Sequence, residues 1–229
     1  MNAKEISIEG LKLKVLIYGK SGTGKTTFAS TFPKPYVFDF DGGMLSQRSK
    51  DVDFDTYDTW NGVLSKLEEL EREKKYETLV LDSVTTMQEY MMKQILTLTR
   101  KPRGTQYEWG ILVLDLKDLF LRLSKMAPNI VITAHEIILQ DEITTEIIVQ
   151  PLVYGKKTPG QMPLWFDEIY RMQVGRTKEG KPEYQMLTTA DVKYTAKSRL
   201  GVLEPVTVWS KDGKAMNAYD IIMGKVKGG

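Results

Sequence analysis

The chain has 229 residues, which is enough for one sizeable α/β domain with its own core and too few for two full ones. With 41% hydrophobic and 27% charged residues it has the composition of an ordinary globular protein, and no segment approaches the roughly 18 consecutive apolar residues of a membrane span. The net charge of +2 excludes a bulk electrostatic argument for nucleic-acid binding, so any DNA-binding surface must be local.

The chain contains no cysteine, and its first residues (MNAKEISIEG) lack the apolar core and cleavage site of an export signal. We therefore expect no disulfide, no thiolate metal site, no membrane partner and a cytoplasmic location. Residues 1–229 are expected to form a single domain with a core over about 12–205.

Short apolar runs alternate with helix-like segments as far as His135, which is the pattern of a mainly parallel sheet covered by helices. Strands are predicted at 14–18 (KVLIY), 36–40 (YVFDF), around Phe54, at 79–81 and at 130–134 (IVITA). Helices are predicted from the glycine-rich loop after the first strand to near Pro33, and over about 59–75, 84–99 and 109–126.

The pattern changes after His135. The segments EITTEIIVQ, EIYRMQVG and EYQMLTT alternate or are β-branched and are separated by glycine turns, which predicts an antiparallel extension. A short helix over about 215–223 and a basic, glycine-ended tail complete the chain. The predicted fold class is α/β: a mainly parallel central sheet flanked by helices, with an antiparallel β extension toward the C-terminus.

A complete nucleotide-binding loop, G-x-x-x-x-G-K-[ST], spans Gly19–Thr26 (GKSGTGKT), directly after an apolar strand and before a helix. The glycines let backbone N–H groups turn inward around a phosphate chain. Lys25 is expected to contact the β- and γ-phosphates; the bland alternative is a glycine-rich turn without a ligand. The predicted nucleotide contacts are Gly19, Lys20, Ser21, Gly22, Thr23, Gly24, Lys25, Thr26 and Thr27.

A Mg²⁺ site is expected beside this loop, formed by the Thr26 hydroxyl and by Asp82. Asp82 follows three apolar residues at the end of a predicted strand (ETLVLDS), where a carboxylate would hold the ion. The alternative for Asp82 is a helix N-cap.

Three further strand-end residues are candidates for the hydrolytic step. Alternation puts Asp39 and Asp41 on one face of the strand YVFDF and its continuation, and Asp41 lies at the very end, where the γ-phosphate is expected. We favour Asp41 as the general base or water-positioning group, with Asp39 as runner-up and a structural turn as the third reading. His135, the only histidine, follows IVITA and is a candidate γ-phosphate sensor, because ligands bind at this edge of open parallel sheets.

Two segments combine cations with aromatic residues or flexible glycines and are candidates for single-stranded DNA binding. Cations follow the backbone and aromatic rings stack on bases. The bland readings are a hydrated connector and an aromatic residue that covers the core. From TRKPRGTQYEWG and YGKKTPGQ the candidates are Arg100, Lys101, Arg103, Tyr107, Trp109, Lys156 and Lys157.

Lys197 and Arg199 lie two residues apart in YTAKSRLG, so on a strand both side chains would point to the same side. Two cations in this arrangement are suited to binding phosphate. The alternative is a solvated edge strand protected by charge.

These motifs resemble the RecA-like ATPase core. The likeness rests on the nucleotide loop, on LVLDSV some 60 residues later and on a polar residue after NIVITA; TPGQMPLWFDEIYRM resembles the stretch after the second DNA-binding loop of RecA. AKSRLG resembles the K-N-R-x-G motif of RadA-type recombinases and DnaB-type helicases. The overall likeness is greatest to the short phage-encoded RecA-like ATPases of the Sak group, over roughly residues 12–205.

The resemblance implies ATP and Mg²⁺ as cofactors, single-stranded DNA as a partner and a homo-oligomer in which Lys197 and Arg199 reach the neighbouring subunit's ATP. It also implies phage-type recombination or annealing in a host cytoplasm, alongside a single-strand DNA-binding protein. Asp41 stands where strand-exchange proteins have glutamate, and no Phe-x-x-Ala polymerisation motif is apparent. The alternatives are a DnaB-like helicase or loader, a small-molecule kinase, and a nucleotide switch with little turnover.

Overall fold

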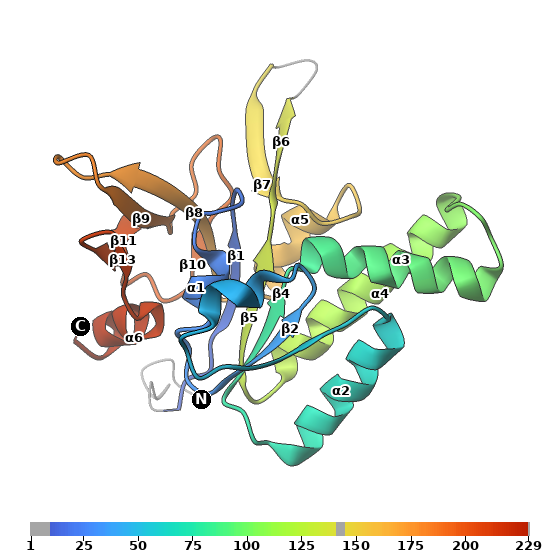
Figure 1. The fold of residues 1–229 in the computed structure, drawn as a ribbon. Coiled ribbons are helices and arrows are strands. Elements are labelled where there is room, and N and C mark those ends of the chain that lie inside the picture. Colours follow the sequence, from blue (N-terminus) through green and yellow to red (C-terminus); the bar gives the residue numbers. More distant parts are fainter. Residues whose placement is uncertain (1–9, 141–144, 229) are drawn as a thin grey trace, which may run out of the picture.

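The computed structural model describes residues 10–140 and 145–228. Its main sheet has the order β11-β9-β8-β1-β5-β4-β2-β3, and β10 pairs with β8 (Figure 1). The parallel part consists of β8 (Glu168–Arg176), β1 (Lys14–Tyr18), β5 (Asn129–Ala134), β4 (Thr78–Asp82), β2 (Pro35–Asp39) and β3 (Asp53–Thr56).

The antiparallel part follows β8. Strand β9 (Pro182–Leu187) pairs with the second half of β8, β11 (Val206–Val208) pairs with β9, and β10 (Lys197–Ser198) pairs with the first half of β8. The predicted fold class is confirmed, although β8 belongs to both parts because its first half is parallel to β1. A small hairpin of β12 (Ser210–Lys211) and β13 (Lys214–Ala215) lies next in the chain.

Helices cover both faces of the sheet. Strands β1, β2, β4 and β5 are buried throughout, as expected for strands between two helical layers. One face packs against α2 (Trp60–Glu73), α3 (Val84–Thr99) and α4 (Gln106–Lys125). The other face packs against α1 (Lys25–Ala29) and α6 (Ala218–Gly228).

The predicted helix boundaries are close to those observed, with two differences. Helix α4 begins at Gln106 and not at 109, because Thr105 and Glu108 form a capping box, a T-x-x-E signal that is present in the sequence. Helix α6 is displaced toward the C-terminus from the predicted 215–223.

The segment EITTEIIVQ forms part of a separate hairpin and not of the main sheet. Strands β6 (Glu136–Gln140) and β7 (Ile147–Pro151) pair antiparallel and extend away from the body (Figure 1). The beginning of this segment, residues 142–144, and the tail residue 229 lie outside the described residues. After β7 the chain forms the short α5 (Thr158–Gln161) and a 3₁₀ turn, η3 (Met162–Leu164).

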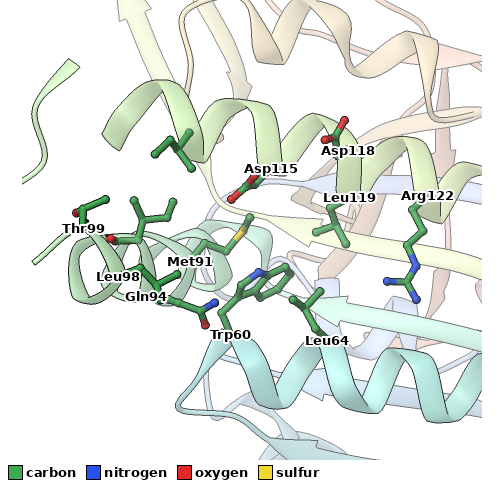
Figure 2. A pocket seen from close by; sticks show the side chains of 12 residues that line it. Trp60, Leu64, Met91, Gln94, Leu98, Thr99, Asp115, Asp118, Leu119 and Arg122 are labelled. Atoms are coloured by element: carbon green, nitrogen blue, oxygen red, sulfur yellow. Dashed lines mark hydrogen bonds between the residues drawn. The ribbon is translucent and has the colours of Figure 1, made fainter. Parts of the chain in front are cut away.

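A groove of about 400 Å³ lies between α2, α3 and α4. Figure 2 shows Trp60 and Leu64 of α2, Met91 of α3, and Asp115 and Asp118 of α4 around it. None of the predicted site residues lines this groove.

No helix in the described part of the chain is long and apolar enough to cross a membrane.

Candidate nucleotide site

The predicted site residues divide between the two ends of the parallel strands. We call the end at which β1, β2, β4 and β5 finish the carboxyl edge, and the opposite end the amino edge. The loop Gly19–Gly24 leaves β1 at the carboxyl edge and leads into α1, as the sequence motif predicts. Gly22 and Gly24 have φ values of +78° and +85°, a backbone conformation that favours glycine.

The Lys25 side chain folds back over this loop. Its Nζ donates hydrogen bonds to the carbonyl oxygens of Gly19 (3.0 Å) and Lys20 (2.8 Å). Burial lowers the pKa of the ammonium, and the carboxylates of Asp82 and Asp41 act in the opposite direction. The cation is therefore held in the concave side of the loop, where an anionic ligand would stabilise its charge.

Asp82 lies between two threonine hydroxyls. Thr26 Oγ1 donates to Asp82 Oδ2 at 2.6 Å, and Thr133 of β5 donates to Asp82 Oδ1. The carboxyl group is 2% exposed, and this burial raises its pKa. Ser83, not Asp82, is the N-cap of α3, which removes the capping alternative.

The donor atoms at this point fit Mg²⁺. A threonine hydroxyl and a carboxylate oxygen at hydrogen-bond distance are the hard oxygen ligands that the ion takes when phosphate oxygens and water complete its shell. No cluster of three or more His, Cys, Asp or Glu that could hold a metal occurs within 10–140 and 145–228, so such a shell would need these additional ligands.

Asp41 and His135 face each other across the site, with His135 Nε2 3.3 Å from Asp41 Oδ2. The expectation that Asp41 continues the strand is wrong: β2 ends at Asp39, and Asp41 lies in the following turn. His135 follows β5, and its backbone N–H donates to Thr85 Oγ1 at 3.0 Å. Two residues for which separate roles were predicted therefore form one pair.

Asp39, the runner-up to Asp41, has a different position. Its carboxylate is 2% exposed and accepts hydrogen bonds from the backbone N–H groups of Gly43 (3.0 Å) and Met44 (3.3 Å). These bonds begin the 3₁₀ turn η2 (Gly43–Gln47). Asp39 therefore has a structural role. Of the two aspartates, Asp41 is the one that lines the cavity.

A cavity of about 700 Å³ joins these groups. It is lined by Ser21, Gly22, Gly24, Lys25, Thr26, Thr27, Phe40, Asp41, Gly43, Ser46, Asp82, Thr86, His135 and Tyr184. Sequence reasoning missed Tyr184, which comes from β9, about 160 residues after the loop, and it missed Thr133, whose place beside Asp82 follows from the pairing of β5 with β4. Only the tertiary fold brings these two residues to the site.

Lys197 and Arg199 lie toward the amino edge, away from this cavity. Lys197 Nζ donates to the carbonyl oxygens of Pro163 and of Phe166 (2.9 Å to the latter), and burial lowers its pKa. Arg199 donates to Asp167 Oδ1 at 2.7 Å and to Pro163 O at 3.4 Å. Both side chains point to the same side, as predicted, but in this chain they contact the segment before β8.

The basic candidates lie at the far end of α3 and the start of α4. Arg100 is the C-cap of α3, with φ +54°, and Arg100, Lys101 and Arg103 are exposed. Together with Lys93, the first two line a shallow depression beside α3. Tyr107 is on the first turn of α4 and is exposed, so it belongs to the helix and not to the connecting loop.

The Trp109 side chain connects the two basic segments by packing against Tyr154. Its ring meets that of Tyr154 edge-on with centroids 4.9 Å apart, and Tyr154 lies just before Lys156 and Lys157, which are both exposed. A Cβ on the intervening Gly155 would lie 2.9 Å from the Val113 side chain, so the loop lies directly on α4. The seven candidates therefore come from two adjacent segments.

The chain is similar to one described protein family and to solved structures. A KaiC-like protein of the hyperthermophilic archaeon Pyrococcus horikoshii OT3 is similar in structure, with 14% identity, a TM-score of 0.44, and 76% of this chain and 77% of that chain covered. No curated protein sequence matches. The family described as "AAA domain" (AAA_24) matches residues 11–200, which include the whole nucleotide cavity. The chain therefore belongs to this AAA domain family and is a P-loop ATPase.

Proposed function

We propose that this protein hydrolyses ATP with Mg²⁺ and couples the nucleotide cycle to single-stranded DNA as an oligomer, in phage-type recombination or strand annealing. The observation that carries the proposal is the single cavity lined by Lys25, Thr26, Asp82, Asp41 and His135. Each of these side chains has a part in phosphoryl transfer to water.

The chemistry assigns a role to each group. The loop N–H groups and Lys25 bind the phosphate chain. They also stabilise the negative charge that develops on the leaving-group oxygens during hydrolysis. Thr26 and Asp82 would hold Mg²⁺, which would neutralise charge on the phosphate oxygens. Asp41 orients the attacking water and accepts its proton, while His135, on the same carboxylate, keeps Asp41 in place and senses the γ-phosphate.

The DNA partner is supported by charge and exposed aromatic surface. Arg100, Lys101 and Arg103 are exposed beside Tyr107, which is 69% exposed, and Lys156 and Lys157 follow Tyr154 on the adjacent loop. A row of cations next to an exposed aromatic ring is suited to binding single-stranded DNA without sequence preference. The likeness to Sak-group ATPases supports the same partner.

The test is steady-state ATP hydrolysis with and without single-stranded DNA, with Lys25→Ala as the blank. We expect stimulation by single strands that is lost when Arg100, Lys101 and Arg103 are all replaced by glutamine. The same triple variant should flatten the salt dependence of single-strand affinity, whose slope is about −0.7 per phosphate contacted.

Each other outcome removes a defined part of the proposal. Hydrolysis that depends on Lys25 but ignores DNA leaves the ATPase and removes the DNA coupling. Binding of ATP without turnover favours the nucleotide switch. An unchanged salt slope in the triple variant removes the Arg100–Arg103 segment from the interface.

A further inference from the structure

Among the described residues that line the nucleotide cavity, Tyr184 is the one that comes from the antiparallel extension. The cavity's other aromatic lining residue, Phe40, is 6% exposed and contacts Tyr57 and Tyr90, so its ring belongs to the core. Tyr184 is only partly buried and lies beside Gly24 of the loop.

The position of the Tyr184 ring is well determined by its neighbours. The ring lies against Trp209, with centroids 5.5 Å apart, and Trp209 in turn meets Phe28 of α1 edge-on at 5.5 Å. The backbone N–H of Tyr184 donates to Ser210 Oγ at 2.8 Å, and its carbonyl accepts from the N–H of Trp209 at 3.0 Å. The ring is therefore preorganised before any ligand binds.

The phosphate loop touches this pair of rings directly. A Cβ added to Gly24 would lie 3.0 Å from the Trp209 ring and 3.3 Å from the Tyr184 ring. A nucleotide whose phosphates lie in the loop therefore has a flat aromatic surface within reach of its other end. Among the described residues that line the cavity there is no asparagine, glutamine or arginine, the side chains that most often read the edge of a base.

We propose that Tyr184 is the stacking residue for the nucleotide base. The assignment rests on the proposed nucleotide site and adds its specificity: purine nucleotides bind through ring overlap, with ATP and GTP little discriminated and pyrimidine nucleotides held less tightly. Stacking of a base on an aromatic side chain contributes about 1–3 kcal/mol.

The test compares binding of Mg·ATP with binding of Mg·tripolyphosphate, which carries the phosphates without a base, by calorimetry. Tyr184→Ala should weaken ATP binding between about 5-fold and about 100-fold. It should leave tripolyphosphate binding unchanged. Tyr184→Phe keeps the ring and should bind ATP as the wild type does.

The alternative is that Tyr184 only covers Trp209. In that case Tyr184→Ala would weaken ATP and tripolyphosphate equally, or weaken neither, and the assignment would be overturned. Failure of Tyr184→Phe to bind ATP would replace stacking with a role for the hydroxyl. If the wild type binds neither probe in a Lys25-dependent way, the nucleotide site itself is wrong and the stacking assignment falls with it.

Discussion

At the carboxyl edge of the sheet, Lys25, Asp41 and His135 line an open cavity, whereas the amino-edge cations Lys14 and Lys197 line no part of that cavity and donate to backbone carbonyl groups. Lys14 Nζ donates to Met126 O (2.5 Å) and Pro128 O (2.6 Å), and Lys197 Nζ donates to Pro163 O and Phe166 O. Lys25 also donates to carbonyl groups, those of its own loop, so the two edges differ in whether the cation also faces a cavity.

The difference follows from where the loops go. At the carboxyl edge the chain turns away in glycine-containing segments, Gly19–Gly24 and Gly42–Gly43, which leaves room between strand ends. At the amino edge, returning segments bring unpaired carbonyl groups close to the strands, and a buried carbonyl must find a donor. A charged residue near a strand end is therefore informative about function only when the adjoining loop leaves a cavity.

Arg199 is the residue that could break this comparison. If it reaches the ATP of a neighbouring subunit, as the resemblance to RadA-type recombinases and DnaB-type helicases implies, Arg199→Ala lowers turnover by about 10³- to 10⁵-fold. Stability should change by about 1 kcal/mol or less, because the Arg199–Asp167 ion pair is exposed. Steady-state hydrolysis and thermal unfolding of the same preparation measure both.

Mixing gives the decisive control. Arg199→Ala subunits that still bind ATP should regain activity when mixed with Lys25→Ala subunits, which supply an intact Arg199. Arg176→Ala is the matched control, since Arg176 also donates to a backbone carbonyl, that of Gly180, and is exposed. Normal turnover by Arg199→Ala alone would show that Arg199 has no catalytic role and that, like Lys14 and Lys197, it only contacts the fold at the amino edge.

Asp82→Asn tests the carboxyl edge, where side chains are expected to act on the ligand more than on the fold. Turnover in Mg²⁺ should fall by about 10²- to 10³-fold, since several kcal/mol of charge stabilisation are lost. The free energy of unfolding should change by about 1 kcal/mol or less, because asparagine still accepts one threonine hydrogen bond and removes a buried charge.

Asp55→Asn is the matched control for that variant. The Asp55 carboxylate accepts a hydrogen bond from Tyr36 and does not line the cavity. It should retain full activity. A large loss of stability in Asp82→Asn, with activity per folded molecule unchanged, would show that the carboxyl edge is also structural.

Glu168 tests the amino edge, where a substitution is expected to lower stability. It is fully buried; Oε1 accepts from the N–H groups of Arg199 (3.0 Å) and Leu200 (2.9 Å), and Oε2 accepts from the Tyr170 hydroxyl (2.7 Å). Glu168→Leu leaves the Leu200 N–H and the Tyr170 hydroxyl without an acceptor, whereas the Arg199 N–H keeps the Asp167 carbonyl, and should cost about 3–5 kcal/mol in urea unfolding. Glu168→Gln keeps one acceptor oxygen and should cost much less; equal losses in the two variants would contradict this account.

Local signals explain how much of the fold was predictable. Helix α3 begins and ends where apolar periodicity predicts, and β1 is observed over the predicted residues, because both patterns are set by neighbouring residues. The start of α4 was missed although the Thr105–Glu108 capping box is visible in the sequence. The information that sets this helix boundary is therefore present in the sequence.

The site was less predictable because it depends on contacts between distant segments. Motif spacing predicts Lys25, Thr26 and Asp82, but nothing near Tyr184 or Thr133 in the chain indicates that they reach the same place. The contacts of Lys197 depend in the same way on the carbonyls of Pro163 and Phe166, some 30 residues away. Site residues that lie within one short motif can be predicted from a single sequence, whereas site residues brought together by strand pairing cannot.

The smallest predicted effect is a pH dependence at the amino edge. Burial lowers the pKa of Lys14 to about 8, below that of an unfolded lysine, and the nearby Asp167 only partly opposes this. Between pH 8 and the unfolded pKa of 10.5 the unfolded chain binds more protons at this residue, so its contribution to stability rises with pH across that window.

We therefore expect the wild type to gain about 1 kcal/mol relative to Lys14→Met between pH 8 and pH 10, after allowance for partial hydration of the amine. Urea unfolding of both proteins at the two pH values measures it, and the other lysines and tyrosines cancel in the difference. Parallel shifts would mean that the amine stays charged on its two carbonyl acceptors. Lys14 would then keep its charge within the fold, and the contrast between the edges would rest on whether the cation faces a cavity and not on its protonation.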